Sequence, residues 1–449
     1  MANVIKLRKG LNINLKGKAT EQKRSIPACD EYALSPECFE GMVPKVVVRE
    51  GDKVKAGDTL FVNKLCPDVC FASPVSGTVS AIVRGERRKV LCVKVKADTN
   101  QVYADFGIRD VAKMSGSEVK ECLLKAGLFG YINQLPYAVS TTPETQPKAI
   151  FISALRDMPL AGSFEFELAG NEKDFQTGLT ALSKVAKTYL GIGSSQTAQA
   201  LTSAQDVEVN VFDGKCPAGN VGVQVNNIDP VNKGEVVWTV DPTAVIFFGR
   251  LFNTGKVNLT RTVAVAGSEI SSPAYVDALV GTPLRAILDG QLKQSEHTRI
   301  IQGNPLTGSL SSLDDYLGAH VSEVTAIPEG DDNDEFLGWI APRTSQFSVN
   351  RSYFSWLFGN KEYALDARIK GGERHMIMSG EYDKYLPMDI YGEYLIKAII
   401  AGDIDKMEQL GIYEVSPEDF AVAEFADSSK LELQKIVREG LNMLRKENA

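Results

Sequence analysis

Residues 50–82 constrain the fold of this chain more than any other stretch, and they read EGDKVKAGDTLFVNKLCPDVCFASPVSGTVSAI. Two Gly-Asp pairs precede a Ser-Pro-x-x-Gly-x-Val sequence, and short β-branched runs lie between these turn residues. Short strands separated by tight turns are typical of a compact all-β unit. The pattern continues to Lys96, so we predict an all-β domain over residues 1–98.

The same order of turns resembles that of lipoyl and biotinyl carrier domains, which present one lysine at the tip of a hairpin. We place the tip here at Cys66-Pro67-Asp68, with Lys64 on the approach and Leu65 beside it. A proline at the apex leaves no isolated lysine for a ligase to modify. The resemblance therefore implies a lipoyl-like barrel-sandwich hybrid that carries no covalent cofactor.

Composition and charge limit the classes of function that this chain can have. A chain of 449 residues is long enough for about three domains. A net charge of −8 argues against nucleic acid as a partner, because phosphate contacts need clustered Lys and Arg. The N-terminus lacks the apolar core of a secretory signal. The apolar runs are far shorter than the roughly 20 residues that cross a bilayer, so we expect no transmembrane segment.

The rest of the chain predicts an α+β multidomain protein. Ser115 and Glu118 form a capping box for a helix, AIFISA at 149–154 is typical of a buried strand, and a helix is expected over 177–190. We expect further strands at VEVNVF, VVWTV and AVIFFG. This alternation predicts a Rossmann-like α/β domain over residues 99–257.

Two further units follow. Short β-rich segments with one helix predict a β-grasp, SLBB-like module over residues 258–330. Apolar residues at helical spacing after Pro387, with Gly402 as a stop signal, predict a mainly helical domain over residues 331–449.

A glycine pair in the α/β region is a weak nucleotide motif. Gly191-Ile-Gly193-Ser-Ser-Gln196 lacks the third glycine of a dinucleotide fingerprint. Because we place it after the helix at 177–190, we interpret it as a helix C-terminus, and the sequence supports no NAD site.

The cysteines and histidines give little sign of a metal. The seven cysteines contain no Cys-x-x-Cys pair, and the three histidines lie far apart in sequence. Cys66 and Cys70 are the weak metal candidates, since they flank the expected hairpin tip. Small, partly buried residues in β structure are the alternative account of both.

One loop, GLFGYINQLPYAVSTTPETQP at 127–147, places aromatic rings among Gly and Pro. Exposed aromatic rings on a loop can stack on a flat ligand such as a quinone. The candidate quinone-binding residues are Phe129, Tyr131, Pro136 and Tyr137. The alternative is that they pack beneath their own loop. We identify no catalytic residue.

Phrases along nearly the whole chain resemble one family, the A subunits of bacterial sodium-translocating NADH:quinone reductases. In chain order they are KLRKGLNINLKG (6–17), FEGMVPKVVVREGDKVKAGDTLF (39–61), FASPVSGTVSAIVRGERRKVL (71–91), LAGNEKDFQTGLTALSK (168–184), CPAGNVG (216–222) and LPMDI (386–390). Each phrase is short, but their co-linear order is specific.

The resemblance implies a peripheral subunit on the cytoplasmic face of the bacterial inner membrane, docked to subunits B to F and associated with ubiquinone or menaquinone. NADH, FAD, FMN and iron-sulfur centres would be held by the partner subunits. One departure limits the transfer of roles. Where the family has His-Pro-x-Gly and then Thr-His-x-His, this chain has Cys216-Pro217-Ala218-Gly219 and then Val223-Gln224-Val225-Asn226.

Two other functions are alternatives. A flavin and iron-sulfur NADH dehydrogenase subunit, similar to the C subunit of Rnf complexes, would need the cysteine clusters and flavin loop that the sequence lacks. An unmodified carrier-like docking protein would use only the β scaffold and its charged tip, Arg84–Lys89.

Overall fold

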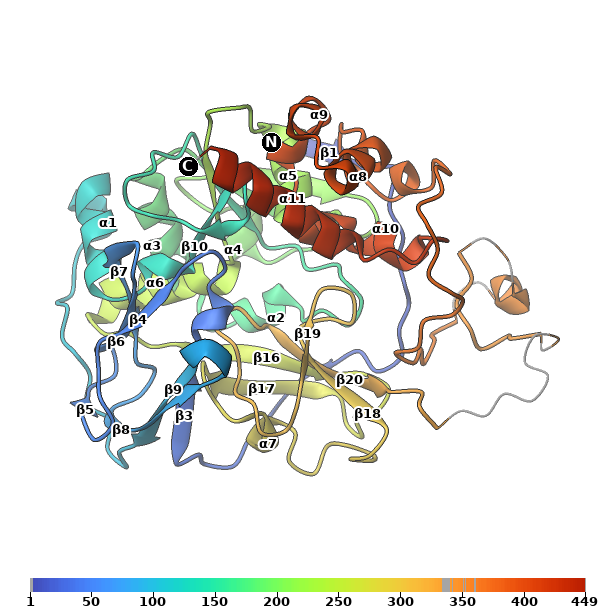
Figure 1. Ribbon diagram of the computed structural model, residues 1–449. Coiled ribbons are helices and arrows are strands. Elements are labelled where there is room, and N and C mark those ends of the chain that lie inside the picture. Colours follow the sequence, from blue (N-terminus) through green and yellow to red (C-terminus); the bar gives the residue numbers. More distant parts are fainter. Residues whose placement is uncertain are drawn as a thin grey trace.

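The computed structural model describes residues 3–332, 340, 342–349, 351, 353–358 and 361–448. Within this part of the chain the strands form four sheets of seven, six, four and three strands. Figure 1 shows the six-stranded sheet in the lower part of the view and the C-terminal helices in the upper part, where they overlap the α/β unit. The protein is of mixed α and β structure.

The seven-stranded sheet is built around five parallel strands. Its order is β1 (Asn3–Lys6), β14 (Glu208–Asp213), β13 (Thr188–Gly193), β12 (Ile150–Ser153), β15 (Val237–Val240), β10 (Ile132–Leu135) and β11 (Val139–Ser140). The first five pair in parallel, and β10 and β11 are antiparallel additions beside β15. The chain adds β13 and β14 on one side of β12, then returns to add β15 on the other side. The order of connection therefore reverses between β12 and β15.

The same part of the chain contains the helices α1 (Gly116–Lys125), α2 (Phe164–Leu168), α3 (Glu172–Ser183), α4 (Gln199–Thr202), α5 (Val221–Ile228) and α6 (Pro242–Thr254). The predicted capping box of α1 is confirmed, because Ser115 and Glu118 bond each other's backbone N–H groups. Of the two predictions that fail here, one is the helix over 177–190. The helix α3 ends at Ser183, and Thr188–Gly193 is the buried strand β13. The Gly191–Gly193 pair thus ends a parallel strand and is not a helix C-terminus.

The strand expected at AVIFFG is the other failure, because these residues lie in α6. Asp241 caps this helix, Pro242 occupies its first turn and Gly255 ends it in the left-handed conformation. The helix is apolar on nearly all sides because it is buried. Gly249 and Gly178 allow it to lie directly against α3, since a Cβ on either would overlap the other helix.

The N-terminal β unit comprises two small sheets. One has β3 (Glu31–Leu34), β9 (Val90–Ala97), β8 (Gly77–Arg84) and β5 (Lys53–Val54), and the other has β4 (Pro44–Val46), β6 (Thr59–Asn63) and β7 (Cys66–Ala72). The hairpin tip differs from our prediction. Asn63 pairs with Cys66, so exposed Lys64 and Leu65 form the turn and Cys66-Pro67-Asp68 begins β7. That no cofactor is attached here stays a prediction.

The six-stranded sheet has the order β19 (Ser309–Ser311), β18 (Thr298–Gln302), β20 (Glu323–Pro328), β16 (Thr260–Ala266), β17 (Ala274–Leu279) and β2 (Thr20–Arg24), with α7 (Leu284–Ile287) alongside. The chain's first two strands therefore leave the N-terminal unit, because β1 joins the parallel sheet and β2 joins this one. These strands connect the three β-containing units through backbone pairing.

The C-terminal part contains α8 (Gly392–Ala401), α9 (Ile404–Gln409), α10 (Ala421–Ala426) and α11 (Leu433–Glu447), with a short 3-10 turn, η8 (Pro417–Phe420). The predicted stop at Gly402 is confirmed by its left-handed conformation. These helices share a buried cluster with Val223 of α5, so they are packed on the α/β unit. Over the described residues, every helix is too short or too polar to span a bilayer.

Candidate functional site

A cavity of about 550 Å³ lies where the carboxyl ends of β12 and β15 meet. In open α/β sheets the crevice beside two strands whose connections diverge is the usual place for a ligand. Ser153 and Asp157 border the cavity from the β12 side, and Val240 and Asp241 border it from the β15 side. The topology therefore places this cavity at the expected ligand position of the sheet.

Three parts of the chain close the cavity. The end of β10 and the residues after it contribute Leu135 and Ala138, the six-stranded unit contributes residues 302–304 and 320–323, and the C-terminal part contributes Glu418 of η8 and Arg438 of α11. The lining combines apolar and polar groups. Ligand pockets in proteins are usually about 300–1,000 Å³ with a few polar groups that fix orientation, and this cavity has that size and character.

Arg156, at the end of β12, is held by a buried network. Its guanidinium donates to Glu167 at 2.8 Å and to the Thr243 hydroxyl at 2.9 Å, and it lies 3.7 Å from Asp241. Burial alone would raise the pKa of Asp241, but Arg156 and Arg261 together lower it. The network fixes one wall of the cavity and holds Asp241 ionised.

Asp157, the next residue, has the opposite environment. Both carboxylate oxygens are buried and neither has a hydrogen-bond partner. Burial raises its pKa to about 6, and the nearby N–H groups of Ala218 and Gly219 offset this only in part. An unpartnered buried carboxyl group is costly, and such groups are rare outside binding sites.

The CPAG loop lies against Asp157. A Cβ on Gly219 would come within 2.6 Å of an Asp157 carboxylate oxygen and 2.5 Å of the Leu155 carbonyl oxygen, so this close approach requires glycine. Gln224, at a position where the resembled family has histidine, donates to the Ser153 hydroxyl at 2.8 Å. Gln224 therefore lies one hydrogen bond behind Ser153, which borders the cavity.

His320 is the second unpartnered group of the wall. Burial lowers its pKa to about 4, so the ring is neutral near neutral pH, and its Nε2 has no hydrogen-bond partner. Its ring centroid lies 5.4 Å from that of Tyr131, whose hydroxyl is also buried without a partner. Tyr131 therefore supports the cavity wall from behind His320.

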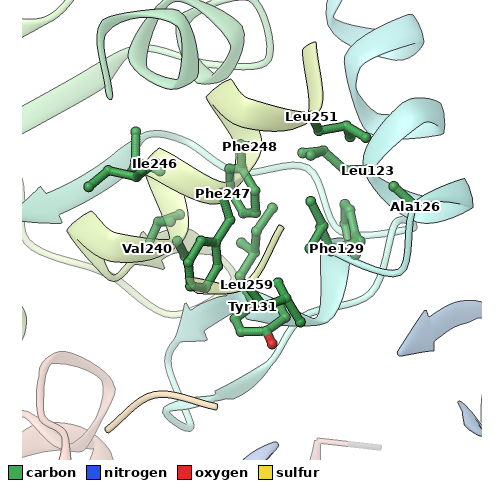
Figure 2. Packing of buried hydrophobic residues seen from close by; sticks show 14 of the residues in the cluster. Leu123, Ala126, Phe129, Tyr131, Val240, Ile246, Phe247, Phe248, Leu251 and Leu259 are labelled. Carbon is green, nitrogen blue, oxygen red and sulfur yellow. The ribbon is translucent and has the colours of Figure 1, made fainter. Parts of the chain in front are cut away.

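The four aromatic-loop candidates lie in different environments. Phe129 and Tyr131 are fully buried in the cluster that Figure 2 shows, where Tyr131 lies edge-on to Phe247 and Phe129 lies edge-on to Trp238. Pro136 is also buried, whereas Tyr137 is partly exposed and its hydroxyl accepts a hydrogen bond from Asn448. The structure brings Tyr131 close to the cavity, but it does not gather all four side chains around one ligand-sized space.

Cys66 and Cys70 both lie in β7. The Cys70 thiol donates to the Leu124 carbonyl oxygen at 2.8 Å, and burial raises the pKa of both thiols. A raised pKa keeps a thiol protonated, whereas metal ligation needs the thiolate. Among the described residues, no three His, Cys, Asp or Glu side chains converge as a metal site.

Sequence reasoning missed Asp157, Arg156 and His320. A usable signal was present for the first two, since Leu155-Arg156-Asp157 follows directly after the buried run AIFISA. Polar residues at the carboxyl end of a parallel strand are ligand-binding candidates. His320 carries no such local signal, because only the tertiary fold brings it to the cavity.

Comparison with known proteins gives consistent matches along the chain. Family models described as the NqrA N-terminal barrel-sandwich hybrid domain, the NqrA second alpha/beta domain and the NQRA C-terminal domain match residues 5–98, 114–257 and 262–312. A solved NAD⁺-reducing [NiFe]-hydrogenase matches with a TM-score of 0.33 and 10% identity, over 68% of this chain and 55% of that one. A likeness this low supports no argument.

Relatives match over the full length. The A subunit of the Na(+)-translocating NADH-quinone reductase from Neisseria meningitidis serogroup C is 33% identical over 448 residues, covering 99% of this chain and all of the relative. Its counterpart from Yersinia pestis bv. Antiqua is 33% identical over 449 residues with the same coverage. These matches give no support to the Rnf-type or carrier alternatives. The chain belongs to the family of Na(+)-translocating NADH-quinone reductase A subunits.

Proposed function

We propose that this chain, which belongs to a sodium-pumping NADH:quinone reductase, binds a quinone headgroup in the cavity between β12 and β15. The observation that carries the proposal is the cavity itself, which lies at the ligand position of the sheet and combines apolar walls with unpartnered polar groups. Of the candidates Phe129, Tyr131, Pro136 and Tyr137, the one with a role at this cavity is then Tyr131. Its ring packs against His320, which borders the cavity.

The chemistry of the wall suits a quinone. A quinone headgroup is a flat apolar ring with two oxygens that need hydrogen-bond partners. Leu135, Ala138 and Val321 offer apolar contacts, while His320 Nε2 and the Asp157 carboxyl group have unused hydrogen-bonding capacity. Both kinds of contact border the same cavity, as quinone binding requires.

A titration with a short-tail benzoquinone tests this proposal. Ala138→Trp should fill the cavity mouth and abolish saturable binding, as followed by calorimetry of the full-length chain. Ala112→Trp makes the same change at an exposed site away from the cavity and should bind as the wild type does. Equal binding by both variants would remove the quinone from this cavity.

We also propose a docking surface for a membrane partner protein of the complex. The turn η5 (Phe354–Leu357) and Phe358 expose four large apolar side chains, with Phe354 at 58% and Trp356 at 46% exposure. Figure 1 shows this orange segment projecting from the body. Residues 340–378 contain six Lys or Arg and three Asp or Glu, in a chain of net charge −8.

The exposed apolar side chains and the excess of basic residues around them fit a partner surface with an apolar groove and an acidic rim. Replacing Phe354 and Trp356 with Ser should reduce recovery of membrane subunits in affinity purification from native membranes. Leu310→Ser, at an even more exposed site on β19, should not. Undiminished recovery by the double variant would contradict this surface, and selective loss of binding to anionic vesicles would assign it to lipid.

We also propose a division of the chain into four domains. The parallel sheet with its reversal between β12 and β15 supports a Rossmann-like domain over 99–257, flanked by a barrel-sandwich domain (1–98), a β-grasp module (258–330) and a helical domain (331–449). The chain would lie on the cytoplasmic face of the membrane with subunits B to F, which would hold NADH, the flavins and the iron-sulfur centres.

A further inference from the structure

Asp157 is the one carboxyl group among the described residues whose two side-chain oxygens are both buried without a hydrogen-bond partner. It borders the cavity and follows β12 by four residues. Its neighbour Arg156 does not satisfy it, because the guanidinium is bonded to Glu167 and Thr243. The N–H groups of Ala218 and Gly219 lie near enough to lower its pKa but outside normal hydrogen-bond geometry, so the carboxyl group keeps hydrogen-bonding capacity for a ligand that enters the cavity.

The hydrogen-bonding role of a carboxyl group depends on its proton. The ionised form only accepts hydrogen bonds, whereas the protonated form donates one. A quinone offers only acceptor oxygens, and a quinol offers two O–H donors. Only the protonated carboxyl group can bond a quinone oxygen, whereas the ionised group favours the quinol, whose hydroxyl donates a charge-assisted hydrogen bond to it.

We propose that Asp157 selects the redox form of the bound headgroup, by accepting a hydrogen bond from a quinol hydroxyl when ionised and donating one to a quinone oxygen when protonated. This inference rests on the proposed quinone site. It assigns Asp157 a specificity role that needs no electron transfer within this chain.

The direction of the pH effect follows from the environment. Burial raises the pKa of Asp157 to about 6, so the group is mostly protonated at pH 5 and mostly ionised at pH 8. Affinity for the quinol should rise as pH increases through this range, and affinity for the quinone should fall. The quinol itself stays protonated here, because phenolic hydroxyls titrate near pH 10, about two pH units above the range.

Other charged groups face the same space and need controls. Arg156 and Asp241 come from the strand ends, Glu323 and neutral His320 from the six-stranded unit, and Glu418 and Arg438 from the C-terminal helices, while the Cys216 thiol adjoins Asp157. His320 titrates below the range, with a pKa of about 4. Burial and Asp419 raise the pKa of Glu418, so this carboxyl group is the competing candidate.

The experiment measures dissociation constants of a short-tail benzoquinone and its quinol, under argon at pH 5 and pH 8, with the full-length chain. The quinone-to-quinol ratio should shift about tenfold between these pH values in the wild type, the size expected for one hydrogen bond to a charged group. The shift should disappear in Asp157→Asn, whose amide both donates and accepts. It should persist in Glu418→Gln and in Asp68→Asn, which alters an exposed aspartate on β7.

Each outcome decides the inference. A wild-type ratio that does not change with pH overturns it, and so does a shift that survives Asp157→Asn but vanishes in Glu418→Gln. If neither redox form binds the wild type at either pH, the quinone site itself fails and this inference fails with it. Near-ultraviolet circular dichroism of each variant at both pH values establishes that it is folded.

Discussion

Arg156 and Asp157 are adjacent residues just after β12, and their buried charged groups have opposite surroundings. Arg156 is bonded to Glu167 and Thr243 in a network that connects α2 and α6 to the strand. Asp157 has no hydrogen-bond partner for either oxygen. A satisfied network holds structure in place, whereas an unsatisfied group reserves its hydrogen bonds for a ligand. The first residue should therefore matter mainly for stability and the second mainly for binding.

Removing the carboxylate of the network should have the largest effect. Glu167→Ala leaves the Arg156 guanidinium buried with one of its main partners gone, and such a loss typically costs about 3–5 kcal/mol. Urea unfolding measures this cost. Glu121→Ala, which removes an exposed partner of Lys125 on α1, should cost no more than about 0.5 kcal/mol. Similar losses for both variants would contradict a structural role for the network.

Neutralising Asp157 should have a smaller effect of the opposite sign. Its pKa is raised to about 6 in the folded chain, so its contribution to stability is present at low pH and lost as pH rises through 6. Asp157→Asn should therefore gain about 2–3 kcal/mol over the wild type at pH 8 and little at pH 4.

Urea unfolding at the two pH values measures this difference, and Asp68→Asn serves as the exposed control. A gain in stability that is the same at both pH values would show that burial does not raise the pKa of Asp157.

Local patterns predicted several of the elements. The Gly-Asp turns marked the N-terminal β unit, the Ser115 capping box marked α1 and Gly402 marked the end of α8. These signals act within a few residues, so they can be read without the fold. The hairpin tip was misplaced because pairing with β6 decides whether Cys66 lies in the turn or in the strand.

The other errors arose where burial removes periodicity. AVIFFG is apolar on all sides because α6 packs against α3 and the sheet, and an apolar run of this length has no period that separates helix from strand. The candidate site could not be predicted from the sequence because its residues come from separate parts of the chain. Asp157 and His320 are far apart in sequence, and only the packing of the six-stranded unit on the α/β sheet makes them line one cavity.

The most direct test of the account is to map a photoreactive short-tail quinone on the full-length chain by mass spectrometry of its peptides. A quinone bound in the cavity should label the peptides that border it, residues 133–138, 155–161 and 320–323. Ala138→Trp should remove this labelling and Ala112→Trp should not. Labelling confined to peptides away from the cavity, unchanged in Ala138→Trp, would contradict the quinone site.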